Sequence, residues 1–194
     1  MLERETNIPP PEDIIRIEEV PPVTQKHNNW CGYASLSMVL QFHGYKDLTP
    51  RVLFEHLHGT YDERKENLDG WLRTPAPTLS NLALVTQELT SLRVDLWNEK
   101  KYKALKERKP EITPFDVLDS YILERKTPPI IRFPHHYKVA VGVRTDRTEY
   151  EFINPSHGGT QLIFNEKVDE LWSYRESSHP DDTSYLMLTV HGQK

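Results

Sequence analysis

The sequence predicts an α+β fold, with helices in the first part of the chain packed on an antiparallel sheet formed by the second. Two observations carry this prediction. Up to about residue 126, apolar segments with helical spacing begin at residues that favour helix N-termini. From residue 128 the pattern changes to short runs of β-branched and aromatic residues separated by turn residues, which is typical of antiparallel strands.

The composition is that of a globular protein with one domain. The chain has 194 residues, of which 37% are hydrophobic and 27% charged. Its formal net charge of -5 argues against non-specific binding of nucleic acid, which requires a concentrated basic surface. The single cysteine excludes an intramolecular disulfide framework and a zinc site built from several cysteines.

Residues 1–22 are predicted to be a lead-in to a single domain over residues 23–194. The alternating run 14–20 could form an edge strand or lie across the domain. The N-terminus lacks the basic and apolar parts of a signal peptide, and no apolar run is long enough to span a membrane. We therefore expect a cytoplasmic protein, with delivery into another cell as an alternative; the oligomeric state stays open.

Five helices are expected. The densely apolar stretch 31–42, stopped by Gly44, predicts a buried helix. Threonine caps predict helices from Thr49, over 78–92 and from Thr113. The mixed-charge run 98–109 is interpreted as a solvated helix face. Strands are expected in the second half at 128–133, 137–144, 149–154, 160–164 and 184–190.

Cys31 stands where a polar loop meets the buried helix. The helix dipole and the backbone N–H groups of its first turn favour thiolate there, which predicts a lowered thiol pKa and a nucleophilic cysteine. A buried, inert thiol is the alternative, and it is the commoner role of a lone cysteine. The surrounding residues decide between the two.

Three neighbours of Cys31 are candidates for its site. Gln25, six residues upstream, could place its side-chain amide beside the Cys31 backbone N–H as a donor to an oxyanion. Gly32 lacks a side chain where substrate and backbone must approach, and Trp30 could shield the thiolate or line the substrate cleft.

A general base is sought among nine histidines. His136 begins the run 136–144, and His135 would face the other side of the same strand. A hairpin to the run 149–154 would bring Asn154 beside His136, where its side chain could orient the imidazole. Asn-Pro is also an ordinary turn signal.

No metal or other cofactor is expected. His56 and His58 lie two residues apart on one short helix, without the i, i+4 spacing and further ligands of a metal site.

Together these residues resemble the papain-like cysteine peptidase superfamily and, more closely, the family of bacteriocin-leader-processing peptidases and its free-standing relatives. The stretches that carry the likeness are PPVTQKHNNWCGYASLSMVLQFHGY, HYKVAVGV and INPSHGG. The resemblance implies that Gln25, Cys31, His136 and Asn154 form the catalytic set, and it selects His136 over His135. Leader peptidases usually carry aspartate where this chain has Asn154, whereas papain has asparagine.

The resemblance implies a thiol peptidase that cleaves a peptide or protein through an acyl-enzyme on Cys31. The same groups could serve a deamidase, an isopeptidase or an acyltransferase, because these reactions differ in leaving group and acceptor. A second class of function is a peptide-binding module that has lost turnover. Trp30, Gly32 and His135 are the expected substrate-binding residues.

Overall fold

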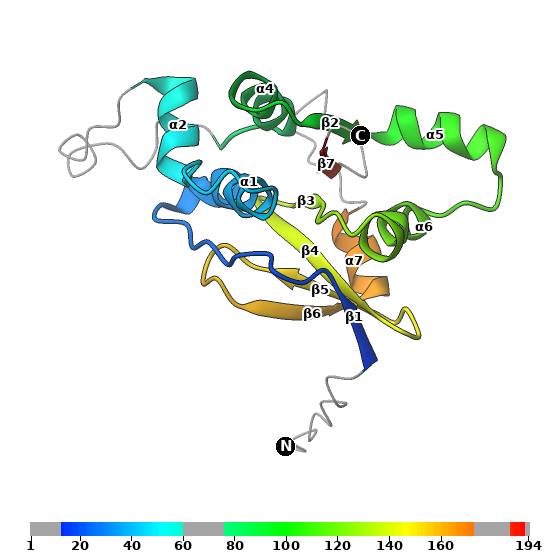
Figure 1. Ribbon diagram of the computed structural model, residues 1–194. Helices are drawn as coiled ribbons and strands as arrows, with labels where there is room; N and C mark the ends of the chain where they lie inside the picture. The colour runs from blue at the N-terminus through cyan, green and yellow to red at the C-terminus, as the bar shows by residue number, and fades with distance from the viewer. Residues whose placement is uncertain (1–12, 60–75, 173–186, 193–194) are drawn as a thin grey trace, which may run out of the picture.

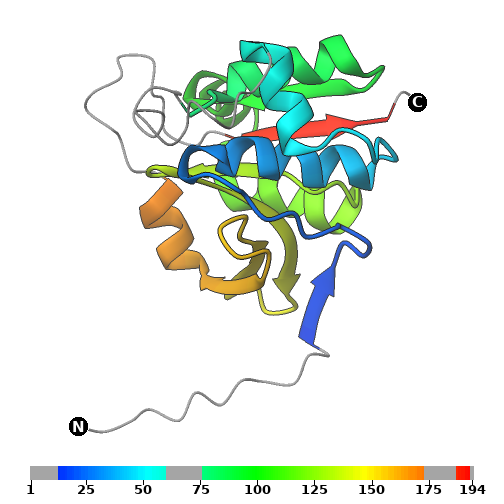
Figure 2. The ribbon, with the colours of Figure 1, turned by 90° about the vertical axis from the view of Figure 1, so that its left-hand side faces the viewer.

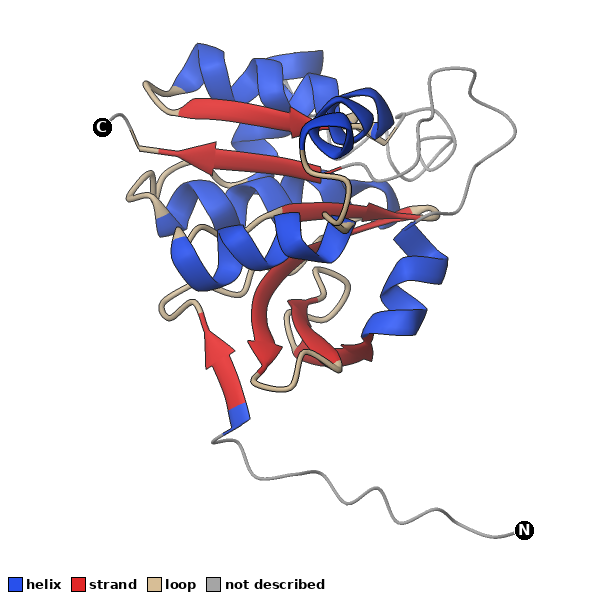
Figure 3. Cartoon of the chain, turned by 90° about the vertical axis from the view of Figure 1, so that its right-hand side faces the viewer, coloured by secondary structure: helices blue, strands red, loops and turns tan. Residues whose placement is uncertain are grey.

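The computed structural model describes residues 13–59, 76–172 and 187–192. Seven antiparallel strands form one sheet in the order β2-β7-β3-β4-β5-β6, with β1 paired to the second half of β4. Figure 3 shows β2 and β7 running antiparallel at one end of this sheet. The strands are β1 (Ile14–Arg16), β2 (Arg93–Trp97), β3 (Ile130–Phe133), β4 (His136–Arg144), β5 (Glu149–Ile153), β6 (Thr160–Phe164) and β7 (Met187–His191).

Helices cover both faces of the sheet (Figure 1). One face packs against α1 (Cys31–Phe42), α2 (Pro50–His58) and α4 (Leu79–Leu89). The other packs against α6 (Pro114–Asp119), the π-helical segment η4 (Ser120–Glu124) and α7 (Asn165–Trp172). The predicted α+β class is confirmed, with the sheet between two helical layers.

The buried helix predicted over 31–42 is α1, and its first ten residues are all buried. Such a helix has no solvated side, which explains why its apolar residues are dense rather than confined to one stripe. Gly44 follows with a φ of 94°, in the left-handed region that glycine enters without steric cost. The bounds of α1 therefore follow directly from the sequence pattern.

The three predicted threonine caps are present. The side chains of Thr49, Thr78 and Thr113 accept hydrogen bonds from backbone N–H groups of α2, α4 and α6. The run 98–109 forms α5 (Glu99–Arg108), and none of its residues is buried. This agrees with a solvated helix.

Strand β4 carries residues of both cores. Tyr137, Val139 and Val141 belong to the core that includes α1, whereas Ala140 and Val143 belong to the opposite core. The pairing with β5 shifts register between Ala140 and Gly142, which explains why the two-residue period changes phase after Val141. Up to Ala140, even-numbered positions of β4 therefore face away from α1.

One strand and one α-helix were not predicted. β2 follows the helix that was expected to continue to residue 92 but ends at Leu89. Polar and apolar residues alternate over only five positions here, and two of these are the charged Arg93 and Asp95. Such a short alternation does not distinguish a strand from a loop. Helix α7 begins at Asn165, the residue directly after β6, so no residue lies between the two elements.

The lead-in contributes the short strand β1 at the edge of β4, one of its two predicted alternatives (Figure 2). Ile17, just after it, is buried in the core around α6. Within the described part of the chain, no helix combines the length and apolar character needed to cross a bilayer.

Candidate active site

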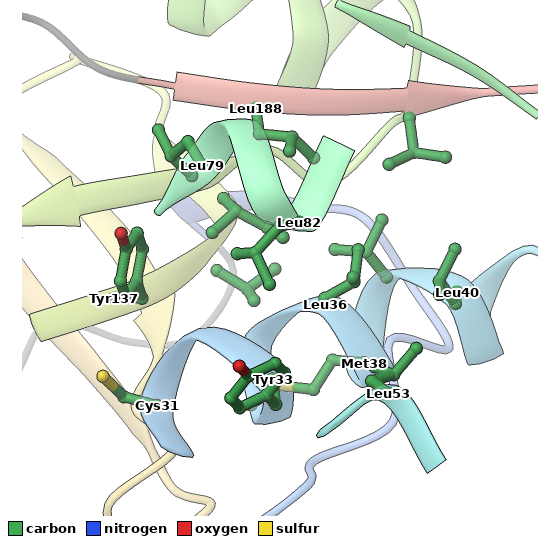
Figure 4. Close-up of a cluster of buried hydrophobic side chains, with 14 of the residues drawn as sticks. Cys31, Tyr33, Leu36, Met38, Leu40, Leu53, Leu79, Leu82, Tyr137 and Leu188 are labelled. Atoms are coloured by element: carbon green, nitrogen blue, oxygen red, sulfur yellow. The ribbon is translucent and has the colours of Figure 1, made fainter. Parts of the chain in front are cut away.

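Cys31 is the first residue of α1, and only 2% of its surface is exposed. Figure 4 shows its sulfur at the first turn of α1, with Tyr137 on the neighbouring strand β4. Three backbone N–H groups are placed to hydrogen-bond a thiolate there, those of Cys31 itself, Gly32 and Tyr137. The site therefore joins the start of α1 to the start of β4.

The pairing of β4 explains why the Tyr137 amide reaches the thiol. Amides along an antiparallel strand alternate between its two neighbours. Ala140 N–H donates to Pro129 on the β3 side, so Tyr137 N–H points to the β5 side. β5 ends at Ile153, opposite Val139, and Cys31 occupies the position beyond that end.

Burial raises the pKa of the Cys31 thiol, and the three backbone N–H groups only partly oppose this effect. The expectation of a lowered pKa, based on the helix N-terminus alone, is therefore wrong for this structure. Removing the sulfur from water disfavours its charge more strongly than the helix end favours it. Cys31 is held as a neutral thiol that needs a base to become nucleophilic.

His136 opens β4 and lies beside Asn154, as the hairpin prediction required. Its Nε2 lies 2.8 Å from Asn154 Oδ1, so Nε2 carries the proton and donates it to this oxygen. The same Asn154 oxygen accepts from Ser156 N–H at 3.0 Å, which fixes the amide orientation. In the neutral imidazole, Nδ1 is then the nitrogen that can accept a proton.

Burial lowers the pKa of His136, although its hydrogen bond with Asn154 partly opposes the change. The positive charges of Lys138 and His157 lower it further. The imidazole is therefore neutral at neutral pH. A neutral thiol and a neutral imidazole make a pair that reacts by general-base transfer.

His135 does not face the other side of the strand, because it is not in the strand. It forms the two-residue turn between β3 and β4 with Pro134, and its φ is 54°. Histidine is one of the few residues that adopt this left-handed conformation with some frequency. His135 is exposed at the tip of this hairpin.

Gln25 lies in the site, but its amide hydrogens do not point outward. Nε2 donates to the carbonyls of His27 at 2.9 Å and Asn28 at 3.1 Å, while Oε1 is buried without a hydrogen-bond partner. Gln25 N–H donates to Pro155 O at 2.8 Å. In this conformation the side-chain amide of Gln25, the predicted oxyanion donor, stabilises its own loop. It would have to release one of these two hydrogen bonds to bind an oxyanion.

Gly32 is required for packing at the first turn of α1. A Cβ at this position would lie 2.6 Å from Pro77 Cγ and 3.3 Å from Tyr137 Cδ2. Tyr137 Oη also donates to Pro77 O at 2.8 Å. Pro77, which lies just before α4, therefore packs directly on the first turn of α1.

Trp30 is a core residue with 3% of its surface exposed. Its ring stacks on Phe54 of α2, with 4.9 Å between centroids, and meets Tyr33 edge-on. This burial corrects the expectation that Trp30 lines a substrate cleft.

Sequence reasoning missed Lys138, Ser156 and His157 around His136, and Pro77 over Gly32. The two-residue period could have placed Lys138 on the face of His136. Pro77 carried no signal, because its contact with Gly32 depends on the path of a distant segment.

His56 and His58 have other partners. His56 Nε2 lies 2.7 Å from Glu88 Oε2, and His58 Nε2 lies 2.8 Å from Tyr33 Oη. Among the described residues, no group of three or more histidine, cysteine, aspartate or glutamate side chains could hold a metal ion.

Comparison with known proteins gives one family match. The sequence matches the model of the Peptidase_C39 like family over residues 17–178. No protein with a curated description matches the chain.

Similar solved structures include the following two. One is the peptidase domain of Streptococcus ComA, a bi-functional ABC transporter involved in a quorum sensing pathway: it is 13% identical, with a TM-score of 0.48, covering 90% of this chain and 100% of that one. The other is UfSP from C. elegans, 15% identical with a TM-score of 0.44, covering 97% of this chain and 36% of that one.

Proposed function

Because this chain belongs to the Peptidase_C39 like family, we propose that it hydrolyses an amide bond of a peptide or protein through an acyl-enzyme on Cys31. The observation that carries the proposal is the hydrogen bond from His136 Nε2 to Asn154 Oδ1 at 2.8 Å. His136 directly precedes Tyr137, whose backbone N–H meets the Cys31 thiol. Because Nε2 donates to Asn154, Nδ1 of His136 is the nitrogen that acts as the base.

In the first half of the proposed reaction, His136 Nδ1 takes the proton of the Cys31 thiol as the sulfur attacks the substrate carbonyl carbon. The carbonyl oxygen becomes an oxyanion, which the Cys31 backbone N–H stabilises together with one Gln25 amide hydrogen released from its loop. His136 then gives its proton to the leaving nitrogen, the C–N bond breaks, and the acyl group stays on sulfur as a thioester.

In the second half, His136 accepts a proton from water as the water oxygen attacks the thioester carbonyl. The C–S bond breaks, the sulfur regains a proton from His136, and the acid product leaves. Asn154 keeps the imidazole in the required tautomer throughout. Ammonia or a lysine amine as leaving group would make the same steps a deamidation or an isopeptide cleavage.

The test compares the wild type with Cys31→Ala on a peptide library prepared by digesting a whole proteome. We expect new peptide N-termini only with the wild type, because the alanine variant lacks the attacking sulfur. New termini are read by amine labelling and mass spectrometry, and parent peptides that have become heavier by the mass change from amide to acid are sought in the same data. Identical peptide lists for the two proteins would refute the proposal.

Replacing Asn154 tests the orientation of the base. The pKa of His136 is lowered, and the base must be neutral, so wild-type activity should fall only as pH drops below the ordinary histidine value of 6.5. Asn154→Asp keeps the acceptor oxygen and adds a negative charge that favours imidazolium. It should stay active and shift the acid limb of the kcat/KM profile to higher pH.

Asn154→Ala is the matched variant, and it should lose about ten- to a hundredfold in kcat/KM because nothing then fixes the imidazole. An acid limb of Asn154→Asp that lies at the wild-type pH or below would contradict the role assigned to Asn154.

A further inference from the structure

Two basic side chains are buried among the described residues, Arg144 and Lys138, and both lie on β4. Arg144 forms an ion pair with Glu149 of β5. Lys138, in contrast, contacts uncharged groups. Its Nζ donates to Gln161 Oε1 at 3.1 Å and lies 5.2 Å from the centre of the Phe133 ring. Only one of the two buried cations therefore has a counter-charge.

A buried cation without a carboxylate is unfavourable, because neither an amide oxygen nor an aromatic ring replaces the water that it loses. In the described part of the chain, no carboxylate lies within ion-pair distance of Lys138. Burial accordingly lowers its pKa. Partly buried Arg16, by contrast, meets Glu151 at 2.6 Å.

The position of Lys138 connects it to the proposed base. His136 and Lys138 are two residues apart on β4 before its register shift, so they share the face that points away from α1. Asn154 lies on the same face, since Ile153 belongs to the α1 core. The charge of Lys138 acts on His136, as does that of His157.

We propose that Lys138, with Gln161, binds a carboxylate of the substrate on the leaving-group side of the scissile bond. This inference rests on the proposed function. There the acyl part is attached to Cys31, which lies beyond the end of β5, level with the sheet, and His136 protonates the leaving amine from the face away from α1. A cation beyond His136, on the face away from α1, therefore meets the leaving part of the substrate.

The chemistry of the two side chains suits a carboxylate. An ammonium group has three N–H donors, and one of them is used by the exposed side chain of Gln161. A carboxylate arriving there gains a charge-assisted hydrogen bond from Lys138 and a second from the Gln161 amide nitrogen after rotation of that side chain. The carboxylate can belong to an aspartate or glutamate side chain or to the C-terminus of the peptide.

The first experiment profiles cleavage of the proteome-derived peptide library by the wild type, Lys138→Met and Lys167→Met. Lys167 is the matched control, an exposed lysine of α7 that pairs with Glu170 on the surface. We expect wild-type sites to be enriched in acidic residues, or in peptide C-termini, after the scissile bond. The enrichment should persist in Lys167→Met and disappear in Lys138→Met.

The second experiment uses synthetic copies of the best-cleaved peptide to identify the source of the carboxylate. One copy has an amidated C-terminus and keeps its acidic residue; another has a free C-terminus and glutamine in place of the acid; a third lacks both carboxylates. Removing the carboxylate that is bound should lower wild-type kcat/KM about tenfold and should matter little to Lys138→Met.

The outcomes separate the two proposals. If the wild type cleaves nothing that Cys31→Ala leaves intact, the proposed function fails and the carboxylate site fails with it. If the wild type cleaves but shows no preference for a carboxylate, or Lys138→Met keeps that preference, the carboxylate site alone is refuted.

Thermal unfolding provides a check on a purely structural role. Lys138→Met places an apolar side chain of similar length in a buried position, so its melting temperature should equal or exceed that of the wild type. A strong decrease would show that Lys138 is needed for the fold and would overturn the inference.

Discussion

His136→Ala should lower kcat/KM about a thousandfold, because the raised pKa of Cys31 leaves the thiol dependent on a base. Among the described residues, no other ring nitrogen is held at that position by Asn154. The measurement is kcat/KM on a peptide identified with the wild type, at a pH well above the wild-type acid limb. An unchanged melting temperature would show that the variant is folded.

His135→Asn is the matched control, since asparagine also adopts the left-handed conformation that this turn requires. We expect its kcat/KM to stay close to that of the wild type. If His135→Asn loses the activity and His136→Ala keeps it, the base is His135 and the assignment moves by one residue.

Gly32→Ala should destabilise the protein by about 2 kcal/mol, because its Cβ would lie 2.6 Å from a ring carbon of Pro77 that cannot rotate away. The sign of this change in stability is informative. Alanine is a better helix former than glycine, so without this contact the substitution would be neutral or stabilising. The free energy of unfolding is measured by urea denaturation.

The kcat/KM of Gly32→Ala should fall as well. Pro77 also accepts the hydrogen bond from the Tyr137 side chain, and the backbone N–H of Tyr137 meets the Cys31 thiol. Gly192→Ala is the control, because nothing lies within 4 Å of a Cβ at that position. A Gly32→Ala protein as stable as the wild type would mean that Pro77 can move away at little cost.

The parts of the fold predicted well from sequence are those determined by local patterns. Cap residues and dense apolar runs predicted α1, α2, α4 and α6, and the short β-branched and aromatic runs predicted β3 to β7. β2 was missed because a five-residue strand at the end of a sheet owes its conformation to β7, almost a hundred residues away in the chain.

In the site, the proximity of His136 and Asn154 was predictable, because a hairpin with a short connection determines which residues are opposite. The electrostatics of Cys31 were not. The helix N-terminus can be recognised in the sequence, but the depth at which it is buried depends on β4, which packs against it. The same reason applies to Gln25 and Trp30, whose partners were set by tertiary packing.

The hydrogen bond from Gln25 N–H to Pro155 O has a consequence for folding. It joins the loop before Cys31 to the loop after Asn154, and these loops are separated by most of the domain. Contacts between such distant segments form late, after loop-closure entropy has been overcome. We therefore expect a partly synthesised or partly folded chain to contain α1 and its thiol without the neighbouring base, so that reactivity develops only once the central hairpin has docked.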